Sequence, residues 1–191
     1  MLKKVFILFL WGAFLGPLGD MCHVLSQTTT YPEHVYRIYL FRLIPYWVPL
    51  LFGSATVLIG VTHVWADGLL RFFFHSSKVR TGEKFRVFVY GAPLIFITVY
   101  GLSGYIPYPE LMLPCVAFLM WYLLDRTWGG ACLGFFTAIL GTGFEIFLVH
   151  RGIFSYQEKA LGLFGVAVWL PWLYVMASIS IGNLARHFFK N

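Results

Sequence analysis

The chain has 191 residues, of which 59% are hydrophobic and only 12% are charged, and its mean hydropathy is +0.75. Soluble domains usually contain about 25% charged residues, so this composition excludes an ordinary soluble domain and predicts a single polytopic membrane domain. In such a protein the net charge of +6 indicates orientation against an anionic membrane surface, and we expect no nucleic-acid partner.

Six apolar segments, separated by polar or turn-forming residues, predict an all-α protein with six transmembrane helices. The first segment follows a basic start, as in a signal peptide. However, it is about twenty residues long and shows no small-residue cleavage pattern, so we expect it to be retained. The expected helices cover residues 5–25, 44–65, 87–103, 110–124, 129–150 and 164–185 within one domain, 1–191.

The basic residues predict the orientation of these helices. A cytoplasmic N-terminus places ten Lys and Arg side chains inside and four outside. Five of the ten lie in the loop of residues 66–86, the most basic part of the chain. We therefore expect both termini in the cytoplasm. The membrane would be the endoplasmic reticulum in a eukaryotic host and the cytoplasmic membrane in a prokaryotic one.

The two ends of the chain carry an internal repeat. A shift of 125 positions aligns the first helix with the fifth, and a shift of 122 aligns the second with the sixth. Both copies enter from the same side, so the repeat is parallel and predicts equal depths for its equivalent residues. The pairs include Gly16 with Gly141, Asp20 with Glu145, Tyr31 with Tyr156, Trp47 with Trp169, Pro49 with Pro171, Phe52 with Tyr174 and Gly60 with Gly182.

Asp20 and Glu145 are the best candidates for a site within the membrane, because a charge at this depth is costly and is usually kept for function. Asp20 shares a helical face with His23, and Thr142 and His150 are donors near Glu145. Three roles are open: acids that only reach water or nearby donors, a polar anchor for a lipid head group, or an acid–base pair. No aspartate-rich, His-box or GxSxG signature accompanies the acids, and we expect no metal or cofactor.

The segment between the fourth and fifth helices carries two further candidates. Trp121 is typical of an aromatic belt at the membrane interface. Asp125 stands near the start of the fifth helix, where an exposed acid favours local capping or the docking of another protein. The three cysteines lie in apolar runs without metal-ligand spacing, so we expect them to be small buried side chains.

Specific motifs run through about two-thirds of the chain, without a gap from Trp121 to Tyr156. In these motifs the chain resembles the insulin-induced gene (Insig) proteins, six-span regulators of sterol homeostasis with both termini in the cytoplasm. The shared residues are Trp121, Asp125-Arg126, Gly130, Leu133-Gly134, Ala138, Thr142, Phe147-Leu148-Val149, Gly152, Tyr156, Trp169-Leu170-Pro171, Gly182-Asn183 and Arg186, with Pro32-Glu33, Trp47-Val48-Pro49 and Gly53 in the first hairpin.

The resemblance implies a non-enzymatic lipid sensor. In the family, an intramembrane cavity takes an oxysterol, and the bound form holds partners with sterol-sensing domains, the SREBP escort protein and HMG-CoA reductase. Asp125 matches the aspartate associated with the escort-protein contact, and Trp121 matches a position near the sterol pocket. Under this interpretation the ligand-binding residues are Asp20, His23, Trp121, Thr142 and Glu145.

The chain departs from the sterol-binding members at the expected pocket. Those members carry amides where this chain has Asp20 and His23, and a hydroxyl where it has Glu145. The pocket is therefore more acidic than theirs. Without a long N-terminal extension, the chain also resembles a minimal or prokaryotic relative. In a host that makes no sterols, we expect a diacylglycerol-like or isoprenoid lipid in place of an oxysterol. The alternatives are a small isoprenoid- or sterol-modifying enzyme that uses Asp20 and Glu145 as acid and base, and a transporter built on the repeat. A homo-oligomer is also open.

Overall fold

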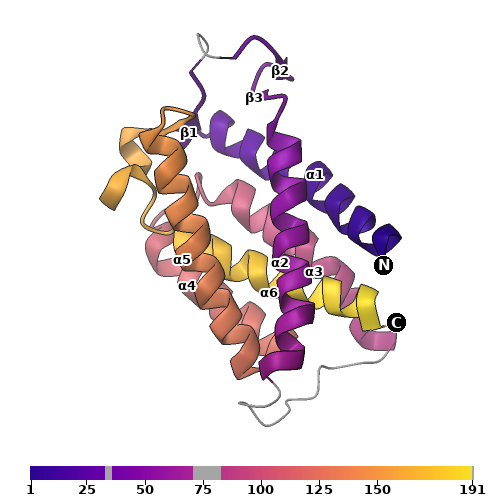
Figure 1. The fold of residues 1–191 in the computed structure, drawn as a ribbon. Coiled ribbons are helices and arrows are strands. Elements are labelled where there is room, and N and C mark those ends of the chain that lie inside the picture. The colour runs from indigo at the N-terminus through magenta and orange to yellow at the C-terminus, as the bar shows by residue number, and fades with distance from the viewer. Residues whose placement is uncertain (33–35, 71–82, 191) are drawn as a thin grey trace.

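The computed structural model describes residues 1–32, 36–70 and 83–190. Within these ranges six α-helices make up most of the chain, which confirms the all-α class (Figure 1). Both chain ends lie on the side of the molecule away from the loops that follow α1 and α5 (Figure 1). The helices are α1 (Leu2–Leu25), α2 (Val48–Leu70), α3 (Glu83–Leu102), α4 (Pro109–Met120), α5 (Trp128–His150) and α6 (Leu170–Lys190).

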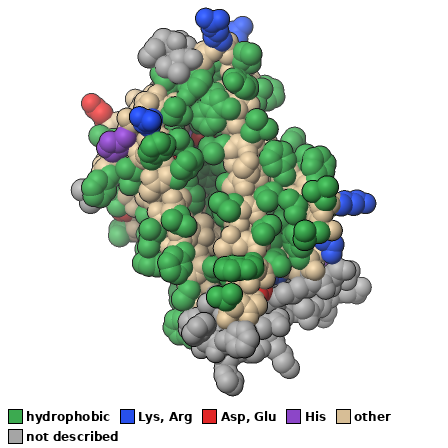
Figure 2. Space-filling model, viewed as in Figure 1, with side chains coloured by type: hydrophobic (Ala, Val, Ile, Leu, Met, Phe, Trp, Pro, Cys, Tyr) green, Lys and Arg blue, Asp and Glu red, His purple; other side chains and the backbone are tan. Residues whose placement is uncertain are grey.

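The surface of the bundle suits a membrane. In the part of the chain that the structure describes, three helices are long and apolar enough to cross a bilayer: Leu2–Leu25, Val48–Leu69 and Trp128–His150. Figure 2 shows hydrophobic side chains over the middle of this face, with Lys, Arg, Asp, Glu and His at its edges. The number of spans and the orientation stay predictions, because most of the basic loop 66–86 lies outside the described residues.

The centre of the fold is a symmetric crossing of α2 and α6. A Cβ added to Gly60 on α2 would lie 2.9 Å from the Cβ of Ala185, and one added to Gly182 on α6 would lie 2.5 Å from the His63 ring. Gly60 is the repeat equivalent of Gly182, and His63 has the same relation to Ala185. The contact at Gly60 and the contact at Gly182 are therefore equivalent in the two repeats. Small residues at both positions let the two helices approach closely.

The outer helices repeat the same packing. A Cβ on Gly16 of α1 would meet the ring of Phe52 on α2 at 2.3 Å, and a Cβ on Gly141 of α5 would meet the ring of Tyr174 on α6 at the same distance. These are the pairs that the sequence repeat aligns. The parallel relation between α1–α2 and α5–α6 is thus confirmed by equivalent contacts.

Short strands close the end of the bundle opposite the termini. Strand β1 (Thr29–Thr30) follows α1 and pairs antiparallel with β4 (Ser155–Tyr156), which follows α5. Strands β2 (Tyr39–Leu40) and β3 (Ile44–Pro45) form a small hairpin before α2. The loops of the two repeats are therefore bonded to each other across the top of the helices.

Two helices begin later than the sequence predicted. The second helix was expected from residue 44 but begins at Val48, because residues 44–45 belong to β3. The sixth was expected over 164–185 but spans Leu170–Lys190. Its expected first turn is a 3₁₀ turn in which Phe164 and Gly165 have φ of 60° and 80°. Neither value fits an α-helix, so the chain bends there and the helix starts after the bend.

Candidate ligand-binding cavity

A cavity of about 540 Å³ lies among α1, α2, α3, α5 and α6. Its walls are mostly apolar and aromatic, with Trp11, Phe52, Phe96 and Leu173 among the lining side chains. The acids Asp20 and Glu145 both line it, so they share one space. This volume and this mixture of apolar walls with a few polar groups are typical of small-molecule sites.

The cavity opens sideways between α2 and α5. Leu58 on α2 and Phe136, Leu140 and Phe144 on α5 line it, although all four are exposed at the surface of the protein. Figure 2 shows a hollow between the surfaces of these two helices, bordered by hydrophobic side chains. In a bilayer such an opening faces acyl chains, so a lipid could enter without crossing water.

The polar end of the cavity is built on the repeat. Each acid accepts a hydrogen bond from the tyrosine eleven positions later in its own repeat and one from a tyrosine on another helix. Asp20 is buried and Glu145 is half-buried. The hydroxyl oxygens lie at these distances from the carboxylates: Tyr31 2.7 Å and Tyr100 3.4 Å from Asp20, and Tyr156 2.6 Å and Tyr174 2.8 Å from Glu145.

The two loop tyrosines are fixed donors. Burial raises the pKa of Tyr31 well above its ordinary value, and the neighbouring Asp20 carboxylate raises it further. Burial likewise raises the pKa of Tyr156, with Glu145 adding to the effect. Both hydroxyls therefore stay protonated near neutral pH, and each donates a hydrogen bond to its carboxylate. The sequence repeat pairs these two tyrosines, but neither was among the predicted ligand-binding residues.

His23 lines the cavity but is used to join α1 to α3. Its Nε2 lies 2.8 Å from the carbonyl oxygen of Tyr100 and 2.8 Å from Oγ of Ser103. A carbonyl oxygen can only accept, so the proton is on Nε2 and is donated toward α3. The ring also packs edge-on against Tyr100, with centroids 4.4 Å apart. We therefore assign His23 to holding Tyr100 in place beside Asp20.

The structure does not bring the other two expected ligand residues to the cavity. Trp121 belongs to a π-helical turn, Trp121–Asp125, and its Nε1 donates to the carbonyl oxygen of Thr127 at 3.0 Å. Thr142 has a buried Oγ1 without a partner among the described residues. Neither side chain is part of the lining.

Asp125 was expected to be exposed, and this expectation was wrong. Its side chain is buried, and its Oδ2 lies 2.6 Å from the guanidinium of Arg186 on α6. Its Oδ1 accepts from the backbone N–H of Thr127 at 3.0 Å and from the hydroxyl of the same residue. Arg186 also pairs with Asp67 on α2 at 2.8 Å. Asp125 therefore ties the turn before α5 to α6 and, through Arg186, to α2.

Gly130 makes room for the buried Asp125. A Cβ at this position would lie 2.3 Å from both carboxylate oxygens, so Gly130→Ala must displace Asp125 from Arg186. We expect this substitution to lower the free energy of unfolding by about 2–3 kcal/mol, measured by titrating the protein in mild detergent with sodium dodecyl sulfate. Gly143→Ala is the matched control on α5, because nothing lies within 4 Å of its added Cβ. Equal losses in both variants would contradict the packing argument.

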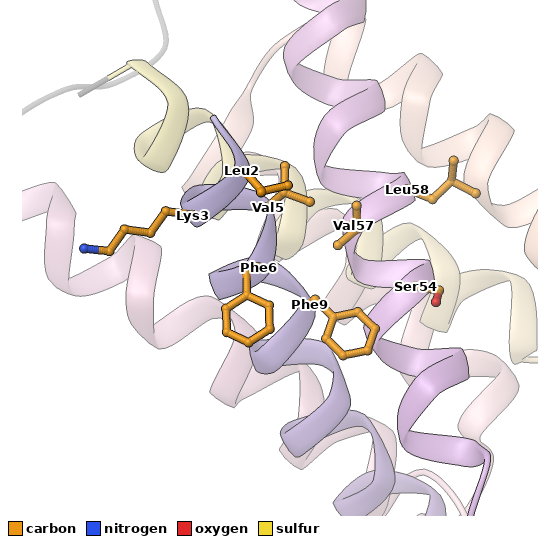
Figure 3. A pocket seen from close by; sticks show the side chains of 8 residues that line it. All are labelled: Leu2, Lys3, Val5, Phe6, Phe9, Ser54, Val57 and Leu58. Carbon is orange, nitrogen blue, oxygen red and sulfur yellow. The ribbon is translucent and has the colours of Figure 1, made fainter.

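A second hollow lies outside the bundle, between the start of α1 and the middle of α2. Figure 3 shows Lys3 reaching away from α2, Phe6 and Phe9 on the side of α1, and Ser54 and Leu58 on α2. The hollow is a broad open groove with no carboxylate among its lining residues. It therefore resembles a lipid-facing surface, whereas the cavity between α2 and α5 has a polar end.

Among the described residues, no group of three or more His, Cys, Asp and Glu side chains could hold a metal ion. The cysteines Cys22, Cys115 and Cys132 are unpaired, and only Cys22 and Cys132 are partly buried, whereas Cys115 is exposed. The expectation that all three are buried was thus wrong for Cys115. An exposed cysteine on an apolar helix surface faces lipid in a membrane, so its position needs no polar partner.

Comparison with known proteins identifies the family. No protein-family model matches the chain. The INSIG protein homolog of Mycolicibacterium vanbaalenii is 31% identical over 96% of this chain and 87% of its own length. The insulin-induced gene 1 protein of Danio rerio is 24% identical over 97% of this chain and 72% of its own length.

Solved structures agree with these relatives. The mycobacterial Insig homolog MvINS from Mycobacterium vanbaalenii superposes with a TM-score of 0.80 at 26% identity, over 97% of this chain and 93% of that one. A cross-linked trimer of MvINS gives a TM-score of 0.82 at 25% identity, over 99% and 95% of the two chains. Together with the motifs in the sequence, these similarities show that the chain belongs to the insulin-induced gene (Insig) family of membrane proteins.

Proposed function

We propose that this chain is a non-enzymatic lipid-binding regulator that holds a hydrophobic lipid in the cavity between α2 and α5. The observation that carries the proposal is the cavity itself, which is apolar along its walls, polar at one end and open toward the bilayer. A lipid with a long apolar body and a small head fits this arrangement. Its tail would contact aromatic walls, and its head would reach Asp20 and Glu145.

Lipid binding can act on the whole bundle because the cavity is lined by both repeats. A ligand between α2 and α5 contacts one helix of each repeat, and both of these helices also pack against α6. If the lipid binds one separation of the repeats more tightly than another, its presence shifts the population toward that separation. Membrane partners that recognise this form would then be held or released. In a eukaryotic host these would be sterol-sensing-domain proteins.

Asp125 would serve such a partner indirectly. Its buried carboxylate fixes the turn before α5, and the exposed side chains around that turn include Tyr122, Leu123, Arg126 and Trp128. The Arg126 guanidinium lies 3.8 Å from the centroid of the Tyr122 ring, which gives this surface a defined shape. A second copy of the chain is another candidate partner, since one solved MvINS structure is a cross-linked trimer.

The proposal is tested by narrowing the opening of the cavity. Leu140→Trp places an indole among the lining residues, and we expect the amount of co-purifying lipid to fall about tenfold, a loss of about 1.4 kcal/mol. Native mass spectrometry with lipid extraction measures this amount. Ile139→Trp is the control, because Ile139 is exposed on the same helix but does not line the cavity. Unchanged lipid in Leu140→Trp would count against the cavity as the site.

The same samples test the enzyme alternative. An isoprenoid or sterol recovered together with a chemically altered form would indicate turnover, whereas a single unaltered lipid supports the regulator. Loosely held bulk lipid in the unsubstituted protein would contradict a selective site altogether.

A further inference from the structure

The polar end of the cavity offers a ligand almost only hydrogen-bond acceptors. The hydroxyl hydrogens of Tyr31 and Tyr156 are donated to Asp20 and Glu145 at 2.7 and 2.6 Å. Tyr174 donates to Glu145 in the same way at 2.8 Å. A hydroxyl that has donated its hydrogen has only acceptor capacity left, and a carboxylate is an acceptor from the start. The exception is the Thr29 hydroxyl, which lines the cavity without a partner among the described residues and can still donate one hydrogen bond. The head of a ligand must therefore supply most of the donors.

No cation of the described chain compensates the two acids. The described residues that line the cavity include no Lys or Arg, and the Nε2 proton of His23 is donated to α3. On the loop after β4, the ammonium of Lys159 donates to the carbonyl oxygen of Ser26. In contrast, the buried Asp125 and the partly buried Asp67 share one guanidinium. Burying carboxylates without a cation costs free energy, and either a proton or a bound cation lowers that cost. A ligand that carries a positive charge is therefore favoured at this end of the cavity.

The two carboxylates also interact with the same neighbouring tyrosines. The Tyr31 hydroxyl, bonded to Asp20, is within electrostatic range of Glu145, and Tyr100 interacts with both carboxylates. The pairing of β1 with β4 keeps the loops that carry Tyr31 and Tyr156 side by side. One compact head group can therefore meet Asp20 and Glu145 together.

We propose that the preferred ligand of this cavity is an amphiphile with a protonated amine as its head, bound between Asp20 and Glu145. This inference rests on the proposed lipid binding and names its ligand class. An ammonium has three donors and no acceptor, so it complements a wall of acceptors. Its hydrogen bonds to carboxylates are charge-assisted and roughly twice as strong as those of a neutral alcohol. A fatty acid or an anionic phospholipid would bring a third negative charge to the same place.

The test compares three probes with the same chain: oleylamine, oleyl alcohol and oleate. Native mass spectrometry in a neutral detergent gives their relative affinities for the purified protein. We expect oleylamine to bind about tenfold more tightly than oleyl alcohol, and oleate to bind least. In the variant Asp20→Asn, Glu145→Gln the preference for the amine should disappear, while oleyl alcohol should still bind.

The control variant removes two negative charges from positions outside the cavity. Glu110 and Glu158 are exposed and do not line the cavity, so Glu110→Gln, Glu158→Gln should keep the amine preference. Equal binding of amine and alcohol to the unsubstituted protein would overturn the inference and leave lipid binding intact. Failure of all three probes together with the absence of co-purifying lipid would overturn both proposals. The comparison of probes needs no variant, so poor folding of a substituted protein does not affect it.

Discussion

Arg186→Met is expected to lower the free energy of unfolding by about 3–5 kcal/mol, because it leaves the buried Asp125 and the partly buried Asp67 without their shared cation. Arg186 is only 2% exposed and bonds Asp125 at 2.6 Å and Asp67 at 2.8 Å. The methionine keeps most of the side-chain length but none of the charge. Titration with sodium dodecyl sulfate in mild detergent measures the loss.

A second substitution distinguishes lost charge from lost packing. Adding Asp125→Asn to Arg186→Met removes one stranded carboxylate and should restore part of the stability. Arg151→Met is the control on an exposed arginine, and we expect it to change the free energy of unfolding by no more than about 0.5 kcal/mol. An Arg186→Met protein as stable as the Arg151→Met protein would refute the role given to the ion pairs.

Gly12→Ala should be nearly as damaging, with an expected loss of about 3 kcal/mol. A Cβ on Gly12 would lie 2.5 Å from the backbone carbonyl oxygen of Phe52 and 2.1 Å from Oγ1 of Thr56. A backbone oxygen cannot rotate away as a side chain can, so α1 and α2 must separate. Both helices line the cavity, and the same variant should therefore also lose bound lipid.

The matched control for this prediction is Gly91→Ala on α3. Nothing lies within 4 Å of a Cβ added there, and alanine favours a helix over glycine by about 1 kcal/mol. We expect this variant to be as stable as the unsubstituted protein or slightly more stable. The close approach of α1 and α2 would be refuted by a Gly12→Ala protein that unfolds at the same detergent concentration as Gly91→Ala.

The repeat and the two acids could be predicted because their signals are local or periodic. The shift of 125 positions between the first and fifth helices predicted one depth for Asp20 and Glu145 from the sequence alone. The same alignment held a clue to Tyr31 and Tyr156, each eleven residues after its acid. Along a continuous helix, a tyrosine eleven residues after the acid would lie too far away to reach the carboxylate. The clue therefore becomes useful only once the loops are known to fold back over the helices.

The second tyrosine of each pair shows where the repeat fails. Tyr174 donates to Glu145, but its repeat equivalent is Phe52, which has no hydroxyl. Asp20 receives its second hydrogen bond from Tyr100 on α3 instead, and the rings of Phe52 and Tyr100 lie 6.2 Å apart. The helix α3 lies outside the repeat, so no alignment within the chain could have identified this donor.

Asp125 and the start of α6 were mispredicted for a related reason. The partners of Asp125 are far away in sequence, and a short polar segment next to a helix start looks the same whether it is exposed or ion-paired. Before α6, Val166 and Ala167 are as apolar as a membrane helix but are buried in a bend. The hydropathy of a segment indicates that it avoids water but does not indicate its backbone conformation. It therefore could not predict the residue at which α6 begins.

The pairing of β1 with β4 also sets the order in which the molecule can be completed. Thr29 is synthesised early, whereas its partner Tyr156 follows only after α5. The first hairpin is therefore completed while the loop after α1 is still unpaired and while Asp20 lacks the opposing loop. The last hairpin supplies both the missing strand and Glu145, so the polar end of the cavity is assembled only when synthesis is nearly finished. A chain truncated before β4 would keep its first helices but would have no closed end to hold a head group.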